Sequence, residues 1–102
     1  MRLAFRVSYL GDLFLGSQLQ AAGRTVEGVF IDACTRLSLF ADWRSARFVS
    51  AGRTDRGVHA RAQVFAFSTD FPERAIETLN WQLPPDCWCT GVVPVAGSFH
   101  PR

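Results

Sequence analysis

Residues 2–9 alternate strictly between apolar side chains and polar or small ones, and this alternation constrains the fold more than any other feature. Its apolar face carries Leu3, Phe5, Val7 and Tyr9. Because successive side chains of a β-strand point to opposite faces, the period of two predicts a half-buried strand. Such a strand needs partner strands and a second layer that covers its apolar face.

From residue 26 the hydrophobic period changes to that of a helix. The stripe consists of Val26, Val29, Phe30, Ala33, Leu37 and Phe40. This spacing places the apolar residues on one side of an α-helix, and Thr25 is in position to cap its N-terminus. The second element is therefore predicted to be a helix that packs on the first strand.

Four further elements are predicted. A short strand over residues 47–51 precedes a strand over residues 62–68, which carries apolar groups on both faces and is expected in the centre of the sheet. A helix then opens with Pro72 and a box-like pair, Asp70 and Glu73, and ends before residue 84. Residues 88–95 form the closing strand, at an edge because Pro94 cannot donate to a neighbour.

The order β-α-β-β-α-β predicts an α+β, ferredoxin-like fold: an antiparallel sheet with two helices on one face. Because 102 residues are enough for only one hydrophobic core, residues 1–102 are expected to form a single domain. With 48% hydrophobic and 20% charged residues the chain is expected to fold as a globule. It has no apolar run of about 18–20 residues and no signal peptide, so we expect no membrane association and a cytoplasmic location.

No metal or cofactor is implied by the sequence. Cys34, Cys87 and Cys89 do not have the spacing of a zinc knuckle or a redox pair, so we interpret them as reduced core or strand residues. His59 and His100 have no second ligand at a metal-binding spacing.

All 11 basic residues are arginine, and they are unevenly placed. Between residues 44 and 61 the chain carries five arginines and one aspartate; these arginines are Arg44, Arg47, Arg53, Arg56 and Arg61. Arginine binds phosphate with two parallel hydrogen bonds and stacks on bases, so this segment fits an anionic partner such as nucleic acid. A solvated surface fits the charge pattern equally well.

Asp55 lies in a glycine-bounded turn between the second and third predicted strands, among Arg53, Arg56 and His59. Neighbouring arginines would keep its carboxylate ionised, ready to act as a nucleophile or base. A hairpin turn in which Asp55 caps backbone amides is the alternative. A phosphate-binding loop is excluded because Val58 and His59 occupy the positions that need lysine and serine or threonine.

Ordered segments along the whole chain resemble motifs of one enzyme family. Residues 51–64, Ala-Gly-Arg-Thr-Asp-Arg-Gly-Val-His-Ala followed by Gln63-Val64, look like the catalytic motif of tRNA pseudouridine synthases of the TruA type. The other similar segments are residues 9–20, 24–27, 79–86 and 99–102. Leu10 and Arg56 depart from the family, which usually has aspartate and, in bacterial members, alanine there.

The resemblance implies a cofactor-independent isomerase with Asp55 as the catalytic nucleophile, which converts uridine to pseudouridine in the anticodon stem-loop of tRNA. It implies that Arg53 holds the displaced RNA and fixes Asp55. It assigns RNA or substrate contacts to Arg56, His59, Arg61, Gln63, Gln18 and Gln20. It also implies a homodimeric parent enzyme with a second half, absent here, that supplies an active-site tyrosine, so this N-terminal catalytic-aspartate half is expected to be inactive alone.

Two other functions stay open at this point. A non-catalytic RNA-binding module would use the ferredoxin-like sheet as its platform, although residues 62–68 lack the pattern of an RNP1 strand. A structural dimerisation domain would self-associate and bind no RNA. Asp55 separates these functions from catalysis, because binding alone does not need it.

Overall fold

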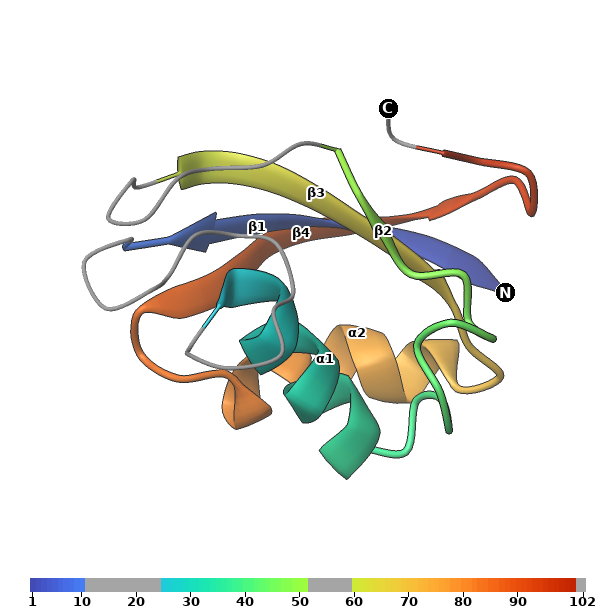
Figure 1. Ribbon diagram of the computed structural model, residues 1–102, viewed down its shortest axis with the longest axis horizontal. Helices are drawn as coiled ribbons and strands as arrows, with labels where there is room; N and C mark the ends of the chain where they lie inside the picture. Colours follow the sequence, from blue (N-terminus) through green and yellow to red (C-terminus); the bar gives the residue numbers. More distant parts are fainter. Residues whose placement is uncertain (11–24, 52–59, 101–102) are drawn as a thin grey trace.

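A computed structural model describes residues 1–10, 25–51 and 60–100, with the backbone alone for residues 60–62. Within them the elements are β1 (Arg2–Tyr9), α1 (Val26–Arg36), β2 (Val49–Ser50), β3 (Ala60–Ser68), α2 (Pro72–Gln82) and β4 (Cys87–Val95). The strands form one antiparallel sheet in the order β2-β3-β1-β4, and both helices cover the same face (Figure 1). The predicted α+β, ferredoxin-like arrangement is confirmed.

Strand β1 lies in the middle of the sheet because its alternation gives it one fully buried face. Phe5 pairs with Phe65 of β3 on one side and with Val92 of β4 on the other. The apolar face of β1 is at most 1% exposed at Leu3, Phe5, Val7 and Tyr9. Strand β3 has a neighbour on each side, as its two apolar faces predicted, and β4 lies at an edge, as Pro94 predicted.

Phe30 of α1 is the centre of the core. Its ring meets the rings of Phe65 at 4.9 Å and Phe5 at 5.9 Å, both edge to face. Phe5 in turn stacks on Phe67 at 5.3 Å. These geometries are the favoured ones for aromatic pairs. The apolar stripe of the helix is therefore held against the two central strands.

Helix α1 begins as predicted and ends earlier. The Thr25 side chain accepts a hydrogen bond from the Gly28 amide at 3.1 Å, which confirms the N-cap. The helix ends at Arg36 because Ser38 takes a left-handed conformation, with φ of 57°. Phe40 still packs edge-on against Phe67, so the apolar period extends beyond the helix.

The capping box predicted for α2 is wrong. Pro72 does occupy the first turn, but the N-cap residue is Phe71, and it makes no side-chain cap. The Thr69 hydroxyl instead accepts a hydrogen bond from the Phe71 amide at 3.1 Å. Strand β2 is also shorter than predicted, because Arg47 has a left-handed φ of 54° and does not extend the strand.

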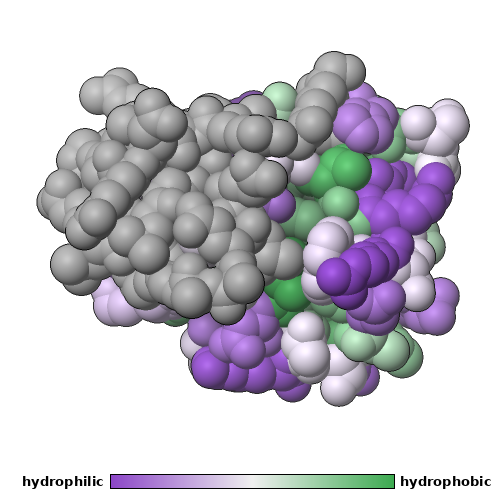
Figure 2. Space-filling view, viewed as in Figure 1, coloured by the Kyte–Doolittle hydropathy of each residue, from purple (hydrophilic) through white to green (hydrophobic). Residues whose placement is uncertain are grey.

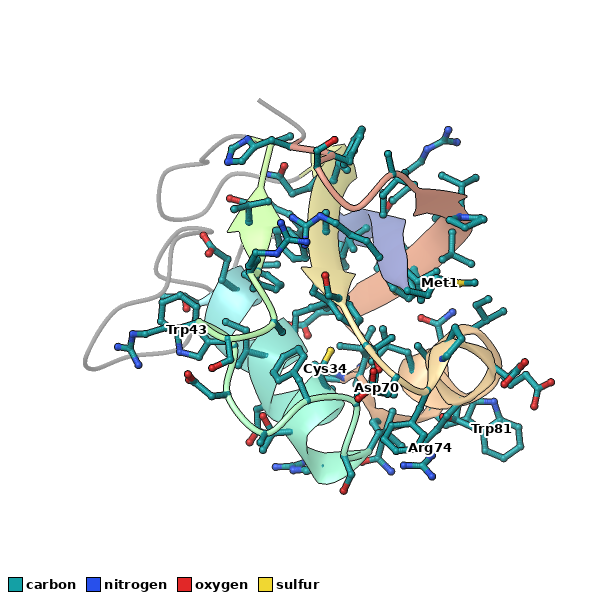
Figure 3. All side chains as sticks on the ribbon, turned by 90° about the vertical axis from the view of Figure 1, so that its right-hand side faces the viewer. Met1, Cys34, Trp43, Asp70, Arg74 and Trp81 are labelled. Carbon is teal, nitrogen blue, oxygen red and sulfur yellow. The ribbon has the colours of Figure 1, made fainter. Side chains whose placement is uncertain are left out.

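The three tryptophans lie in different surroundings, and Trp88 is 37% exposed. Trp43 packs against the core, whereas Trp81 is 87% exposed. Figure 3 shows Trp81 pointing away from the molecule, because α2 buries only Ala75 and Leu79.

On the face of the molecule shown in Figure 2, apolar side chains reach the surface in a strip beside polar ones. Neither described helix is long and apolar enough to span a membrane.

The three cysteines are free thiols in the core or in a strand, as predicted: Cys34 and Cys87 are buried and Cys89 is half-buried. Burial, and secondarily Cys87, raises the pKa of Cys89 to about 12. Burial, and secondarily Cys89, raises the pKa of Cys34 well above its ordinary value. Burial and the neighbouring cysteine both disfavour the thiolate, which is the reactive form of cysteine.

Replacement of Phe30 by alanine should lower the free energy of unfolding by about 3–5 kcal/mol, the usual cost of removing a buried phenylalanine. Because a domain of this size is stable by only about 5–15 kcal/mol, the loss is readily measured by urea denaturation. Trp81→Ala is the matched control and should change stability by less than about 0.5 kcal/mol. Equal losses in the two variants would contradict a core centred on Phe30.

Alkylation by iodoacetamide at pH 8 should be at least roughly 10³-fold slower for Cys34 and Cys89 in the folded chain than in guanidinium. With a pKa of about 12 only about 10⁻⁴ of Cys89 is thiolate at this pH, against about a quarter in an unfolded chain. Mass spectrometry of modified peptides over time gives the rates. Rapid labelling of the native chain at Cys34 would show that the helix does not stay packed on the sheet.

Candidate functional site

One end of the sheet brings together three of the segments that resemble family motifs. At this end Tyr9 pairs with Ala60 of β3 and with Cys87 of β4. The next amide, that of Leu10, donates to the Asp86 carbonyl at 2.9 Å. Tyr9, Ala60 and Asp86, which belong to the segments 9–20, 51–64 and 79–86, therefore lie at this end, and α1 begins on the same side of the molecule (Figure 1).

The residues on both sides of the Asp55 turn are held by the sheet. Before the turn, Ser50 pairs with Phe65, and the Ala51 amide donates to the Val64 carbonyl at 2.9 Å. After the turn, the chain re-enters the sheet at Ala60. Several predicted site residues lie outside the described residues: Asp55, Arg53, Arg56, His59, Gln18 and Gln20. Arg61 belongs to β3, which the structure describes there by its backbone alone.

Strand β3 is irregular directly after the turn. Val7 pairs with Gln63 and Tyr9 pairs with Ala60, so β3 has one more residue than β1 over this stretch. An extra residue in one strand bends it and redirects side chains, and such bulges are common beside active sites. Gln63 is 7% exposed, and its Oε1 atom accepts a hydrogen bond from the Val64 amide at 3.0 Å. Gln63 is thus set into the sheet.

The face of the sheet opposite the helices carries a shallow apolar depression of about 370 Å³. Ala4 and Val64 line it on the two central strands, Gly91 and Val93 line it on β4, and Phe99 lines it from beyond β4. Arg6 adds the positive charge of an exposed side chain. A flat apolar surface with a cation beside it suits a planar, partly apolar group such as a nucleobase.

Within the arginine-rich segment the structure describes the side chains of Arg44 and Arg47, and these two make different contacts. The Arg44 guanidinium lies 4.5 Å from the centre of the Trp43 ring and 3.9 Å from Asp42, and it is largely exposed. Arg47 donates to the Gly97 carbonyl at 2.6 Å and to the Ser68 hydroxyl at 3.4 Å. Arg47 is therefore already occupied within the fold, whereas the exposed Arg44 is in contact with solvent.

The burial of Arg2 could not be predicted from the sequence. The alternation of β1 put it on the polar face, yet it is only 4% exposed. Its Nε atom donates to the Phe99 carbonyl at 2.9 Å, and Nη2 donates to the Arg47 carbonyl at 3.0 Å. Burial, and secondarily Arg47, lowers the pKa of Arg2. No local sequence signal shows this burial, because the groups that Arg2 contacts lie 44 to 97 residues away along the chain.

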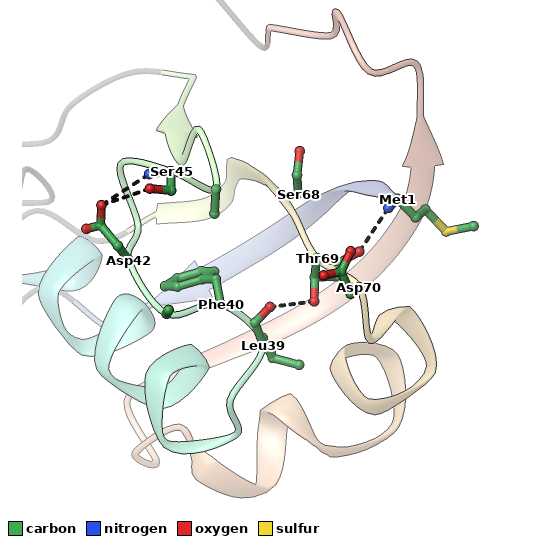
Figure 4. A pocket seen from close by; sticks show the side chains of 10 residues that line it. Met1, Leu39, Phe40, Asp42, Ser45, Ser68, Thr69 and Asp70 are labelled. Carbon is green, nitrogen blue, oxygen red and sulfur yellow. Dashed lines mark hydrogen bonds between the residues drawn. The ribbon is translucent and has the colours of Figure 1, made fainter.

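A second hollow, of about 280 Å³, lies at the other end of β1. Its polar groups bond one another: the Met1 ammonium donates to the Thr69 carbonyl at 2.9 Å, and the Thr69 hydroxyl donates to the Leu39 carbonyl at 2.6 Å (Figure 4). The Ser45 hydroxyl donates to Asp42 at 3.2 Å. We assign these contacts to closure of the fold, since they tie the N-terminus to the ends of α1 and β3.

Within the described ranges, no three His, Cys, Asp or Glu side chains are arranged to hold a metal ion. Asn80, from the segment 79–86, has a structural contact: its side-chain amide donates to the Cys89 carbonyl at 3.0 Å and accepts from the Cys89 amide at 2.7 Å. It thereby satisfies the backbone of the edge strand β4 at this residue, as a neighbouring strand would.

Proteins named tRNA pseudouridine synthase A are similar to this chain over its whole length. The identity is 64% with the protein from Methanoculleus marisnigri, 66% with that from Methanosphaerula palustris and 51% with that from Methanocorpusculum labreanum. The chain spans 38%, 36% and 36% of these curated relatives and matches their N-terminal part. No family model matches the chain.

Proposed function

Because this chain belongs to the family of the tRNA pseudouridine synthase A proteins, whose N-terminal part it matches, we propose that it is the aspartate-bearing domain of a tRNA-uridine isomerase. The enzyme converts uridine to pseudouridine in the anticodon stem-loop of tRNA. It works in the cytoplasm, as a homodimer, and needs no cofactor. The isolated domain, residues 1–102, is inactive because the second half of the cleft is missing.

The observation that carries this proposal is the convergence of three motif-like segments at the Tyr9 end of the sheet. Tyr9 pairs with Ala60, next to the Asp55 turn, and with Cys87, next to the segment 79–86. Residues far apart in the sequence are thereby gathered at one place, which an active site requires and a plain hairpin turn does not. The irregular start of β3 adds a second feature that is frequent at such sites.

The chemistry is an isomerisation in which atoms and electrons balance within the substrate. The bond between C1′ and N1 of uridine breaks, the uracil turns while it is held, and a bond forms between C1′ and C5. N1 gains a proton and C5 loses one, so no oxidant or reductant is needed. Asp55 is the nucleophile, and Arg53 keeps it ionised and holds the displaced RNA. The target base leaves its stack to reach the site.

The remaining residues divide into two groups. The first group binds RNA: Arg56 and Arg61 contact phosphate, and Gln18 and Gln20, from the segment after β1, also contact the RNA. His59 lines the turn, and Gln63 supports it from within the sheet, where its side chain bonds the Val64 amide. A non-catalytic RNA-binding module would use the same sheet but would not require Asp55.

In the full-length protein, Asp55→Asn should reduce tritium release from tRNA with 5-tritiated uridine by roughly 10³-fold or more, the scale for loss of a nucleophile. Asp32→Asn is the matched control: Asp32 is exposed on α1, where it pairs with Arg36 at 2.8 Å, and activity should not change. The isolated 102-residue chain should release no tritium. Near-normal release by Asp55→Asn would remove this residue from the mechanism.

RNA binding by the isolated chain should be weak and should fall with salt, with a log–log slope of roughly −0.7 for each phosphate contact on a single strand. Arg56→Gln should reduce the magnitude of the slope by about 0.7, whereas Arg36→Gln, on the helix side, should leave it unchanged. Fluorescence anisotropy with a labelled anticodon stem-loop measures both. An affinity that does not depend on salt would favour a module that binds bases by stacking.

A further inference from the structure

The chain after β4 does not continue outward but crosses the open face of the sheet. A tight turn, closed by a hydrogen bond from the Phe99 amide to the Ala96 carbonyl at 2.9 Å, reverses its direction. Arg47, which precedes β2, then bonds Gly97 at 2.6 Å. Strands β2 and β4 are the two edges of the sheet, about 14 Å apart at the usual strand spacing. Figure 1 shows the segment returning on the side away from the helices.

Arg2 holds this returning segment from the central strand. Its guanidinium joins three parts of the chain: it donates to Phe99 after β4, to Ser68 at the end of β3, and to the carbonyls of residues 46 and 47 before β2. The donor–acceptor distances are 2.9 Å to Phe99, 3.3 Å to Ser68, 3.5 Å to Ala46 and 3.0 Å to Arg47. Nε and both terminal nitrogens are thus engaged.

The bonding of Arg2 is unusual for a buried cation. Each of these acceptors is an uncharged oxygen, and the charge within the described residues that lowers the pKa of Arg2 is the positive charge of Arg47. Burying a charge costs free energy, and hydrogen bonds to uncharged oxygens offset only part of that cost. The planar fork of arginine does what an apolar residue cannot: it fixes several carbonyl oxygens relative to one another.

We propose that Arg2 is a positioning residue, which together with Arg47 fixes the segment 97–100 as a wall of the open-face depression. Phe99 is the residue that lines the depression and also accepts the Arg2 hydrogen bond. It begins the segment 99–102, one of those that resemble family motifs. The inference rests on the proposed function, because it assigns this wall to the site where the RNA is held during isomerisation.

Arg2 acts through geometry and not by binding RNA phosphate itself. Its nitrogens already donate to protein oxygens, and only 4% of the residue is exposed. A shift of about 1 Å in a wall of an active site can lower the rate about 10²-fold. Loss of the fork should therefore slow turnover, while the surfaces that bind tRNA stay intact.

The test compares Arg2→Lys and Arg2→Met with Arg36→Met in the full-length protein. Arg36 is the control, since it is an exposed arginine on α1, on the other side of the sheet from the depression. Both Arg2 variants should lower kcat by about 10- to 100-fold with KM changed less than about threefold, and Arg36→Met should leave kcat unchanged. Wild-type kcat in Arg2→Lys would overturn the proposal, because charge alone would then suffice.

Hydrogen exchange in the 102-residue chain tests, independently of activity, the clamp formed by the hydrogen bonds from Arg2 and Arg47 to the segment 97–100. The Phe99 amide, bonded in the turn, should exchange at least about tenfold faster in both Arg2 variants, and at the wild-type rate in Arg36→Met. If the Arg2 variants do not fold, Arg47→Gln replaces them: Arg47 is exposed, and its loss frees the Gly97 carbonyl without opening the core. Unchanged exchange at Phe99 in every variant would disprove the clamp.

The two proposals fail in different ways. If Asp55→Asn keeps its tritium release, the proposed function is wrong, and the exchange rates at Phe99 still decide whether Arg2 fixes the segment. If Asp55→Asn is inactive while Arg2→Met and Arg36→Met turn over alike, the function stands and the positioning role of Arg2 is wrong.

Discussion

The register of β1 between β3 and β4 is the constraint on which the rest of the structure depends. Phe5 faces α1 beside Phe65 and stacks on Phe67, whereas Arg6, the next residue, faces the open side. A slip of one residue would exchange the two faces and put arginine into the core. The same register fixes both ends of the sheet: Tyr9 beside Ala60 at one end, and Arg2 beside Ser68 at the other. Packing of the core therefore also decides which segments meet.

The two faces of the sheet are stabilised by different physical effects. On the helix side, aromatic rings such as Phe30 and Phe67 exclude water, and burial of apolar area supplies the stability. On the open side, helices do not cover the strands, and the returning segment is held by directional hydrogen bonds from Arg2 and Arg47. Apolar residues such as Val93 remain 57% exposed there. Folding does not need this exposure, whereas binding of a planar apolar group would use it.

The elements and their order could be predicted from the sequence because they depend on local period. Thr25, the buried face of β1 and the edge position of β4 all follow from neighbours a few residues apart. The failures have two causes. Near the start of α2 a local turn at Thr69 takes the place of the expected capping box. Arg2 is buried by contacts with distant segments, around residues 46–47, 68 and 99. For the candidate site, sequence patterns named the chemical groups, and the pairing of strands was needed to bring their segments together.

The segments that carry the proposed chemistry are anchored in two ways, and the difference has consequences. The Asp55 turn is held at Ala51 and Ala60 by backbone pairing, which almost any side chain at those positions would preserve. The segment 97–100 has a backbone hydrogen bond in its turn, from Phe99 to Ala96, but it is joined to the rest of the fold by the side chains of Arg2 and Arg47. Under our proposal a single substitution would therefore release it while the sheet stays intact. Backbone anchors therefore make a catalytic turn robust to sequence change. Side-chain anchors make the position of the segment 97–100, the proposed wall of the open-face depression, depend on one or two residues. Substitution of those residues would move the wall without altering the fold.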